Sequence, residues 1–370
     1  MKRFSVVVLH YNAPAFLEGA LHSLVRATEG MDAEIIVADN ASDRFDKDYF
    51  SGLFPGVTFL PFPENYGFAK GNNLAVREAS GEYVFLINPD VLVPEDLFRR
   101  LLPKMEQAEA LGLAGIRLMD GRGRFLPESK RRVPGFLSVL DRMGGTGGGR
   151  YYDTRLAETE DGETEILVGA FMGFRKEDYE KVGGLDESYF MYGEDIDLSF
   201  SFLRAGYRNY YFGSLGALHF KGESTPRNAR YRAHFINASV KFYRKYGKPP
   251  LTWLAPLGKP LLHLWHLLRK DTPLRQPLPE RYVYTGRDEA LLNRLRHLYP
   301  AVQTCQLAPM NKETLYITDP RESGYAPVLD FMWKFREHPY YYRFTAPSGR
   351  FIYGSDAADA KGEIIYLNPS

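Results

Sequence analysis

The chain has 370 residues, about two and a half times the roughly 150 residues of an average domain, which predicts one large domain and a smaller one. With 44% hydrophobic and 25% charged residues, the composition is that of a globular protein and excludes intrinsic disorder. One cysteine excludes a disulfide framework or a cysteine metal cluster, and no apolar run reaches the roughly 18 residues of a membrane span. We therefore expect a soluble, cytoplasmic protein.

Charge is balanced over the whole chain but not along it. The formal net charge is +1, which gives no reason to expect nucleic acid as a partner. Residues 241–275 nevertheless hold many basic residues and a single acid, Asp271, together with leucines three or four positions apart. This pattern favours a helix, starting near Pro260, that lies on an anionic membrane surface. The alternative is a helix packed against the C-terminal part of the protein.

The first hundred residues alternate between strand and helix patterns. Apolar, β-branched runs predict strands at Phe4–His10, Glu34–Asp39, Val57–Phe62 and Glu82–Asn88. Helical spacing predicts helices from Pro14 to about Gly30 and from about Phe68 to Ser80. Continuous apolar strands separated by helices indicate a mostly parallel sheet covered on both faces, whose ligands bind beyond the carboxyl ends of the strands.

The rest of the chain is less regular. Residues 118–152 are basic and glycine-rich, which predicts a long mobile loop, and regular structure resumes with Ile166–Phe174 and a helix over Glu194–Ala205. From about Tyr282 a second alternation of strands and helices predicts a small α/β or α+β domain. We therefore divide the chain into a catalytic domain at 1–248, a basic amphipathic connection at 249–279 and an accessory domain at 280–370.

Several enzyme classes are excluded by missing motifs. The sequence contains no P-loop, no G-x-G-x-x-G after the first strand, no H-E-x-x-H and no G-x-S-x-G. What remains are acids and amides at predicted strand ends. Asp39 and Asp90 follow two strands of the same sheet, so both can serve one ligand. Asp39 could accept a hydrogen bond from the imide N–H of a pyrimidine base, and Asp90 could bind a divalent cation that holds a diphosphate. Helix capping and an Asx-turn are the structural alternatives for such residues.

An acid pair and a histidine complete the candidate residues. Glu194 and Asp195 precede an amphipathic helix, and burial beside a second acid would make such a carboxylate a general base. Their structural alternative is favourable charge at a helix N-terminus. His219 follows another apolar stretch, where a lone histidine is more often a structural hydrogen-bonding group than a ligand.

Taken in order, these motifs resemble the family 2 glycosyltransferases, and in particular their bacterial rhamnosyltransferase-like branch. The resemblance covers about Phe4 to Gly247 and rests on the segments SVVVLHYN, VADNASD, ENYGFAKGNN, LINPDV, VGAFMGFRKEDYEKVGGLDESYFMYGEDIDLSF and HFKGEST. It implies a GT-A fold with a mixed, mostly parallel sheet. The implied activity is inverting transfer of a rhamnose-like or other hexose from a UDP- or dTDP-sugar to a hydroxyl of a glycan or lipid-linked acceptor, in cell-surface polysaccharide synthesis.

The resemblance also implies roles for individual residues. Asp195 corresponds to the general base, and Glu194 beside it orients the acceptor. The nucleotide-binding positions are Asn12, Asp39, Asn65, Gly67, Asn72 and Asn88. Asp90 and His219 correspond to the residues that hold Mn²⁺ or Mg²⁺. Asn88 stands where the family's D-x-D motif has its first acid, so one anionic metal ligand is missing and metal binding is expected to be weaker.

Further expectations concern the surroundings of this site. Basic residues at 120–150 and 220–230 are candidates for a lid over the donor: Arg122, Arg124, Lys130, Arg131, Arg132, Lys221 and Arg227. Residues 280–370 are candidates for acceptor recognition, partner binding or a homodimer contact. Two other classes remain open, a sugar-activating nucleotidyltransferase and a non-catalytic nucleotide-sugar-binding protein.

Overall fold

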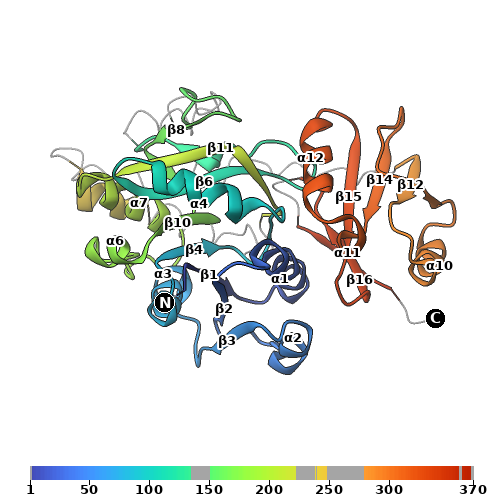
Figure 1. Cartoon of the computed structure of the whole chain (residues 1–370), viewed down its shortest axis with the longest axis horizontal. Helices are drawn as coiled ribbons and strands as arrows, with labels where there is room; N and C mark the ends of the chain where they lie inside the picture. Colours follow the sequence, from blue (N-terminus) through green and yellow to red (C-terminus); the bar gives the residue numbers. More distant parts are fainter. Residues whose placement is uncertain are drawn as a thin grey trace.

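The computed structural model describes residues 2–134, 151–221, 238, 240–247, 279–357 and 361–367. These residues form a large sheet flanked by helices and a smaller C-terminal sheet beside it (Figure 1). No helix among them is long and apolar enough to cross a membrane. The predicted amphipathic helix near Pro260 and Arg227 of the predicted lid lie outside the described residues, so both stay predictions.

The large sheet is mixed and mostly parallel, as predicted. Its strands run in the order β3 (Val57–Pro61), β2 (Ala33–Asp39), β1 (Phe4–His10), β4 (Tyr83–Ile87), β10 (Phe171–Arg175), β6 (Leu111–Met119), β11 (Arg208–His219) and β5 (Val91–Leu92), and β8 (Asp161–Thr164) pairs with β11. Strand β10 is antiparallel to both of its neighbours, and β5 and β8 are antiparallel to β11. Strands β1, β2, β3, β4, β6 and β11 all point the same way.

Helices cover both faces of this sheet. They are α1 (Pro14–Thr28), α2 (Lys47–Leu53), α3 (Gly67–Glu78), α4 (Leu97–Gln107), α6 (Lys176–Lys181) and α7 (Glu194–Arg204). Helix α1 starts with Pro14, whose fixed φ suits the first helical position, and buries Leu17, Leu21 and Leu24 on one face. Helices α3 and α7 contribute to a separate apolar cluster that also contains Val7 and Leu86. The sheet is therefore buried on both faces, which is why its strands read as continuous apolar runs.

The prediction of one mobile loop over residues 118–152 is wrong for the described part of that range. After β6 the chain makes a short turn and a 3-10 helix, η1 (Pro127–Ser129), and then strand β7 (Lys130–Arg131) pairs with β9 (Ile166–Leu167). The Lys130 and Arg131 side chains are buried, Lys130 donating to backbone carbonyls. Glycine and charge suggested a solvated loop here, but the charged groups find backbone and carboxylate partners inside the protein.

The C-terminal sheet confirms the expected small second α/β layer. Its order is β13 (Gln303–Thr304), β12 (Arg281–Tyr284), β14 (Thr314–Thr318), β15 (Tyr340–Thr345), β16 (Phe351–Gly354) and β17 (Glu363–Tyr366). Strands β13, β12, β14 and β15 are parallel, and the last two pairings are antiparallel. The connecting helices are α10 (Glu289–Leu298), α11 (Pro320–Ser323) and α12 (Ala326–Lys334).

The two sheets share an apolar core. Phe16 of α1 and Phe220, just after β11, stack edge-on against Tyr353 at ring-centroid distances of 5.5 and 5.7 Å. Phe344 lies 5.9 Å from Phe220, and all four rings are buried. Polar contacts add to the interface, since Arg26 of α1 donates to the Pro320 carbonyl. The domain boundaries at 248 and 280 stay a prediction, because residues 248–278 are not described.

Candidate active site

The predicted site residues gather at one edge of the large sheet. Strands β1, β2, β4 and β11 are parallel and end at His10, Asp39, Ile87 and His219. The carboxyl ends of parallel strands lie on the same side of a sheet, which is where open α/β sheets bind ligands. The edge therefore collects the loops that follow these strands, together with the start of β10 beside the end of β4.

Asp39 is buried and held by its neighbours. Its Oδ1 lies 2.8 Å from His10 Nδ1 and accepts from Ser42 Oγ at 2.6 Å, while Oδ2 accepts from the Ser42 amide at 3.1 Å. Burial opposes ionisation of Asp39, but the hydrogen bonds from His10 and Ser42 outweigh it and lower the pKa of the carboxyl group. The carboxylate is thus kept ionised, and the Asx-turn alternative is present alongside any binding role.

Asn40, which the sequence interpretation treated only as part of a turn, joins two loops of the edge. Its Nδ2 donates to Asn65 Oδ1 at 2.9 Å and to the Gly67 carbonyl at 3.2 Å, and its Oδ1 accepts from the Tyr66 amide. Asn65 Oδ1 also accepts from the Gly67 amide. A polar residue after a strand was the only signal in the sequence. The partners lie about 25 positions away, so their pairing could not be predicted.

The other residues predicted to bind the nucleotide make contacts within the protein at this edge. Asn12 has a positive φ of 52°, and its side chain exchanges hydrogen bonds with the backbone amide and carboxylate of Asp43. Asn72 is buried on α3 and donates to the Phe68 carbonyl. Asn88 directly follows β4, and its backbone amide donates to the Ala170 carbonyl. Asn12 and Asn72 therefore support the loops, and their roles in nucleotide binding stay predictions.

The turn before α7 packs against the Gly67 loop. The Phe68 amide donates to the Phe190 carbonyl at 2.8 Å. A Cβ added to Gly67, whose φ is +74°, would lie 2.4 Å from that same carbonyl oxygen, so only glycine fits. Gly169 lies against both Phe68 and Asp195, at 3.6 and 3.4 Å from a built Cβ. The predicted nucleotide loop and the predicted base are therefore adjacent.

Asp195, in the first turn of α7, forms a buried ion pair with Arg131. The Arg131 Nη2 to Asp195 Oδ2 distance is 2.6 Å, and only 8% and 13% of the two side chains are exposed. The same nitrogen donates to the Leu167 carbonyl at 2.7 Å, while the Gly169 amide donates to Asp195 Oδ2 at 3.3 Å. The pairing of β7 with β9 holds Arg131 in place. Arg131 was expected in a mobile lid and is instead fixed beside the predicted base.

Glu194 has a different environment from its neighbour. Its Oε2 is buried and has no hydrogen-bond partner among the described residues. Burial, followed by the charge of Asp195, raises the pKa of Glu194 to about 8, against the opposing influence of Arg131. The Arg131 pKa is raised, because the charge of Asp195 outweighs the effect of burial. Glu194 therefore keeps its proton at neutral pH.

Asp90 and His219 meet at the far end of the edge. His219 Nε2 lies 3.4 Å from Asp90 Oδ1, and both side chains are over 90% buried. Strand β5 pairs with β11 here, placing Val91 opposite His219. Asp90 Oδ1 and His219 Nδ1 have no hydrogen-bond partner among the described residues. Asp90 Oδ1 therefore faces Nε2 of His219, whereas Nδ1 lies on the other side of the imidazole ring, and a divalent cation held by the two residues stays a prediction. Within the described part of the chain, no three His, Cys, Asp or Glu residues are grouped as a metal cluster.

Two other described basic residues assigned to a lid, Arg122 and Lys221, have partners elsewhere. Arg122 donates to the Tyr340 carbonyl of the C-terminal sheet and lies 4.5 Å from the Tyr341 ring centre. Lys221 forms an ion pair with Glu128. The Arg122 contact links the turn after β6 to the second sheet, so Arg122 acts as an interface residue and the lid prediction is wrong for it.

The comparisons with known proteins agree with the fold and with the motifs at this edge. The model of the family Glycosyl transferase family 2 matches residues 5–183. This match confirms the resemblance to the family that the motifs predicted. A solved structure of GalNAc-T7 with UDP, GalNAc and Mn²⁺ shares the fold, with a TM-score of 0.52, 15% identity and coverage of 67% of this chain and 50% of that chain.

Two bacterial relatives are also similar to this chain. The N-acetylglucosaminyl-diphospho-decaprenol L-rhamnosyltransferase of Mycobacterium tuberculosis is 29% identical over 274 residues, which cover 67% of this chain and 87% of that protein. The rhamnosyltransferase WbbL of Escherichia coli K12 is 28% identical over 211 residues, covering 50% of this chain and 72% of its own length.

Proposed function

We propose that this glycosyltransferase transfers a hexose, with rhamnose as the leading candidate, from a UDP- or dTDP-sugar to a hydroxyl of a lipid-linked or other glycan acceptor, with inversion. The supporting observation is the Arg131–Asp195–Glu194 cluster, which lies at the same sheet edge as the Asp90–His219 pair and the Asp39 loop. Cell-surface polysaccharide synthesis is the process that such an acceptor implies. The diphospho-decaprenol in the name of the mycobacterial relative supports the lipid-linked acceptor.

Single displacement needs a base on the acceptor side and no enzyme nucleophile. In the proposed step the acceptor oxygen attacks the anomeric carbon, its proton passes to Asp195, and the bond from that carbon to the diphosphate oxygen breaks. Arg131 and the Gly169 amide hold Asp195 Oδ2, whereas Oδ1 accepts only from the Ile196 amide, at 2.8 Å, among the described residues. Arg131 therefore acts as a positioning residue that fixes the orientation of the base.

Glu194 plays a different part from Asp195 in this proposal. Because its pKa is raised to about 8, it carries a proton at neutral pH and does not compete as a base. A protonated carboxyl group can donate a hydrogen bond to the acceptor, while an ionised one cannot. Its buried Oε2 has no hydrogen-bond partner among the described residues and could take up such a bond once the acceptor reaches it. The structure thus favours Asp195 as base and Glu194 as an orienting donor.

A divalent cation, Mn²⁺ or Mg²⁺, would be held by Asp90 and His219 and would supply positive charge to the departing diphosphate. Asn88 contributes an amide in place of an acid, so the donor set carries one negative charge from Asp90. Asp39 would accept a hydrogen bond from the imide N–H of a pyrimidine base, which favours UDP or dTDP over GDP. The imide proton would approach Oδ2, whose only hydrogen bond within the described chain comes from the Ser42 amide.

The test is release of free nucleotide from a panel of UDP- and dTDP-sugars, with transfer to water as the acceptor-independent readout. Asp195→Asn should abolish release while leaving UDP affinity within about twofold of wild type. Because Asp195→Asn leaves Arg131 buried without its anion, retained UDP binding also serves as the folding control. Release that persists in Asp195→Asn would refute the role of Asp195. Absence of release by the wild type with every donor would refute the proposed donor class.

A further inference from the structure

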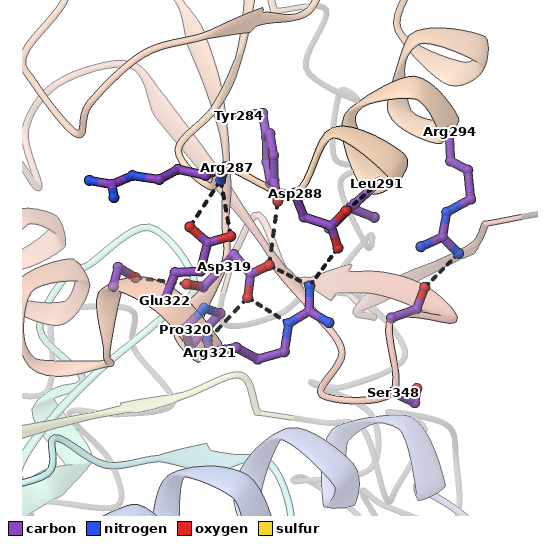
Figure 2. Close-up of polar contacts among 12 residues, drawn as sticks. Tyr284, Arg287, Asp288, Leu291, Arg294, Asp319, Pro320, Arg321, Glu322 and Ser348 are labelled. Carbon is purple, nitrogen blue, oxygen red and sulfur yellow. Dashed lines mark hydrogen bonds and ion pairs between the residues drawn. The ribbon is translucent and has the colours of Figure 1, made fainter.

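The C-terminal sheet has a topological switch point of its own. Strand β12 connects through α10 to β13 on one side, whereas β14 connects through α12 to β15 on the other. In open α/β sheets the crevice beyond the carboxyl ends of two such strands is where ligands bind. Here that position lies after β12 and β14, and it is filled by a cluster of charged residues from 287–294 and 319–322 (Figure 2). None of these residues belongs to the edge described above.

One guanidinium group of the cluster is fixed by an acid. Asp319 directly follows β14, is completely buried, and caps α11 by accepting from the Arg321 amide. Arg321 Nε and Nη2 donate to the two oxygens of Asp319 at 2.9 and 2.5 Å, and Asp288 Oδ2 lies 3.6 Å from Nη2. Both acids therefore face the same side of Arg321. The remaining nitrogen, Nη1, has no hydrogen-bond or ion-pair partner among the described residues.

A second guanidinium group approaches the same place from α10. Arg294 Nη1 donates to the Gly349 carbonyl at 3.0 Å, and its Nη2 has no such partner in the described chain. A Cβ built on Gly349 would lie 3.5 Å from Arg321 Nη1 and 3.7 Å from Arg294 Nη2. The two unpaired nitrogens thus face one point, which is open because Gly349 has no side chain. In Figure 2 both groups reach toward the loop that carries Ser348.

Two positively charged groups that are directed at one point would be stabilised by an anion between them. We propose that Arg294 and Arg321 bind a phosphate group of a ligand at this switch point, separate from the nucleotide at the large sheet. A phosphate presents oxygens in several directions, so it can accept hydrogen bonds of about 2.8 Å from guanidinium groups that arrive from two elements. Ser348, next to Gly349, places a further polar side chain at the loop.

Arg287 belongs to the same cluster but not to this site. Its backbone amide donates to both oxygens of Glu322, and its exposed side chain extends away from Arg294 in Figure 2. Changing Arg287 therefore removes the same charge from the same cluster without removing a proposed ligand. It is the matched control for Arg294.

The experiment is calorimetric titration of the full-length protein with inorganic pyrophosphate, in EDTA and at constant ionic strength, with and without saturating UDP. We expect binding that persists with UDP present, weakens about tenfold or more in Arg294→Gln, and is unchanged in Arg287→Gln. Arg294→Lys, which keeps the charge but loses the fork, should give a smaller loss. UDP affinity should be the same in all variants, so this outcome is independent of the proposed transferase activity.

Three results would overturn the site. The first is no pyrophosphate binding by the wild type when UDP is saturating. The second is equal binding by wild type and Arg294→Gln, and the third is equal weakening in Arg294→Gln and Arg287→Gln, which would reduce the effect to net charge. Inorganic phosphate, titrated in parallel, distinguishes a single phosphate ligand from a diphosphate by which of the two binds more tightly.

Discussion

Removing the guanidinium of Arg131 should be strongly destabilising, because it leaves a buried carboxylate without its counter-ion. Arg131→Met keeps much of the side-chain volume but removes the charge that pairs with Asp195 at 2.6 Å. With 8% and 13% of these side chains exposed, water screens the pair poorly. Breaking one side of a buried pair costs about 3–5 kcal/mol. The Leu167 carbonyl also loses a donor, so we expect a loss near the upper end of that range.

Urea denaturation of four proteins measures this effect: wild type, Arg131→Met, Asp195→Asn and the double variant. Because the two side chains touch, their changes should not be additive, and we expect a coupling free energy of about 2–3 kcal/mol. Arg132→Met is the matched control. Arg132 is the next residue, but its side chain is 46% exposed and 4.0 Å from Glu165, so it should cost no more than about 1 kcal/mol.

Equal losses of stability in Arg131→Met and Arg132→Met would contradict a buried ion pair between Arg131 and Asp195. A loss below about 1 kcal/mol, or a coupling free energy with Asp195 below about 0.5 kcal/mol, would mean that the ion pair does not exist in solution or is screened by water. Arg131→Lys adds a functional readout. It keeps the charge without the planar fork, so kcat should fall more than UDP affinity if Arg131 orients the base.

Three further outcomes follow from the same contacts. Burial and the charge of Asp195 raise the pKa of Glu194 from its ordinary value of 4.5 to about 8 in the folded protein. The contribution of Glu194 to the free energy of unfolding should therefore decline as pH rises through this window, and the Tm gain of Glu194→Gln should grow from pH 5 to 9; a pH-independent difference would contradict this. Asp90→Asn should abolish the gain in UDP affinity that Mn²⁺ gives the wild type in calorimetry, whereas an unchanged gain would place the metal elsewhere. Gly19→Ala should lower the free energy of unfolding by about 1–3 kcal/mol in urea denaturation, because its Cβ would lie 1.8 Å from the Tyr353 hydroxyl. Gly52→Ala is the control and should not destabilise, because a Cβ there would meet nothing within 4 Å. Equal effects of the two substitutions would argue against the contact between α1 and the C-terminal sheet.

Much of the fold was predictable because local signals and tertiary structure agree. The strand predicted at Phe4–His10 is β1 with the same bounds, and the helix predicted at Glu194–Ala205 is α7, one residue shorter. Both faces of the sheet are covered, so each strand is a continuous apolar run that sequence periodicity detects. The C-terminal sheet was likewise visible as a second alternation of elements, although its packing against α1 through Phe16 was not.

The site was predictable in its residues but not in their pairing. Motifs identify Asp195 and Glu194, but nothing in the sequence indicates that Arg131, 64 positions earlier, would pair with Asp195. A basic, glycine-rich context favoured a solvated loop, whereas the pairing of β7 with β9 buries this arginine. Asn40 was overlooked for a similar reason, since its partners follow β3 and are brought to it by the parallel pairing of β2 with β3.

We propose that a pyrimidine nucleoside diphosphate binds at the edge formed by β1, β2 and β4. Calorimetry is the direct test of this binding. UDP, dTDP, GDP and CDP would be titrated against wild type and Asp39→Asn, each with and without Mn²⁺. We predict that UDP or dTDP binds in preference to GDP and that Asp39→Asn removes this preference, with Ser42→Ala as the control for loss of the turn. Equal affinity for all four nucleotides, or binding by none of them, would contradict the proposed site.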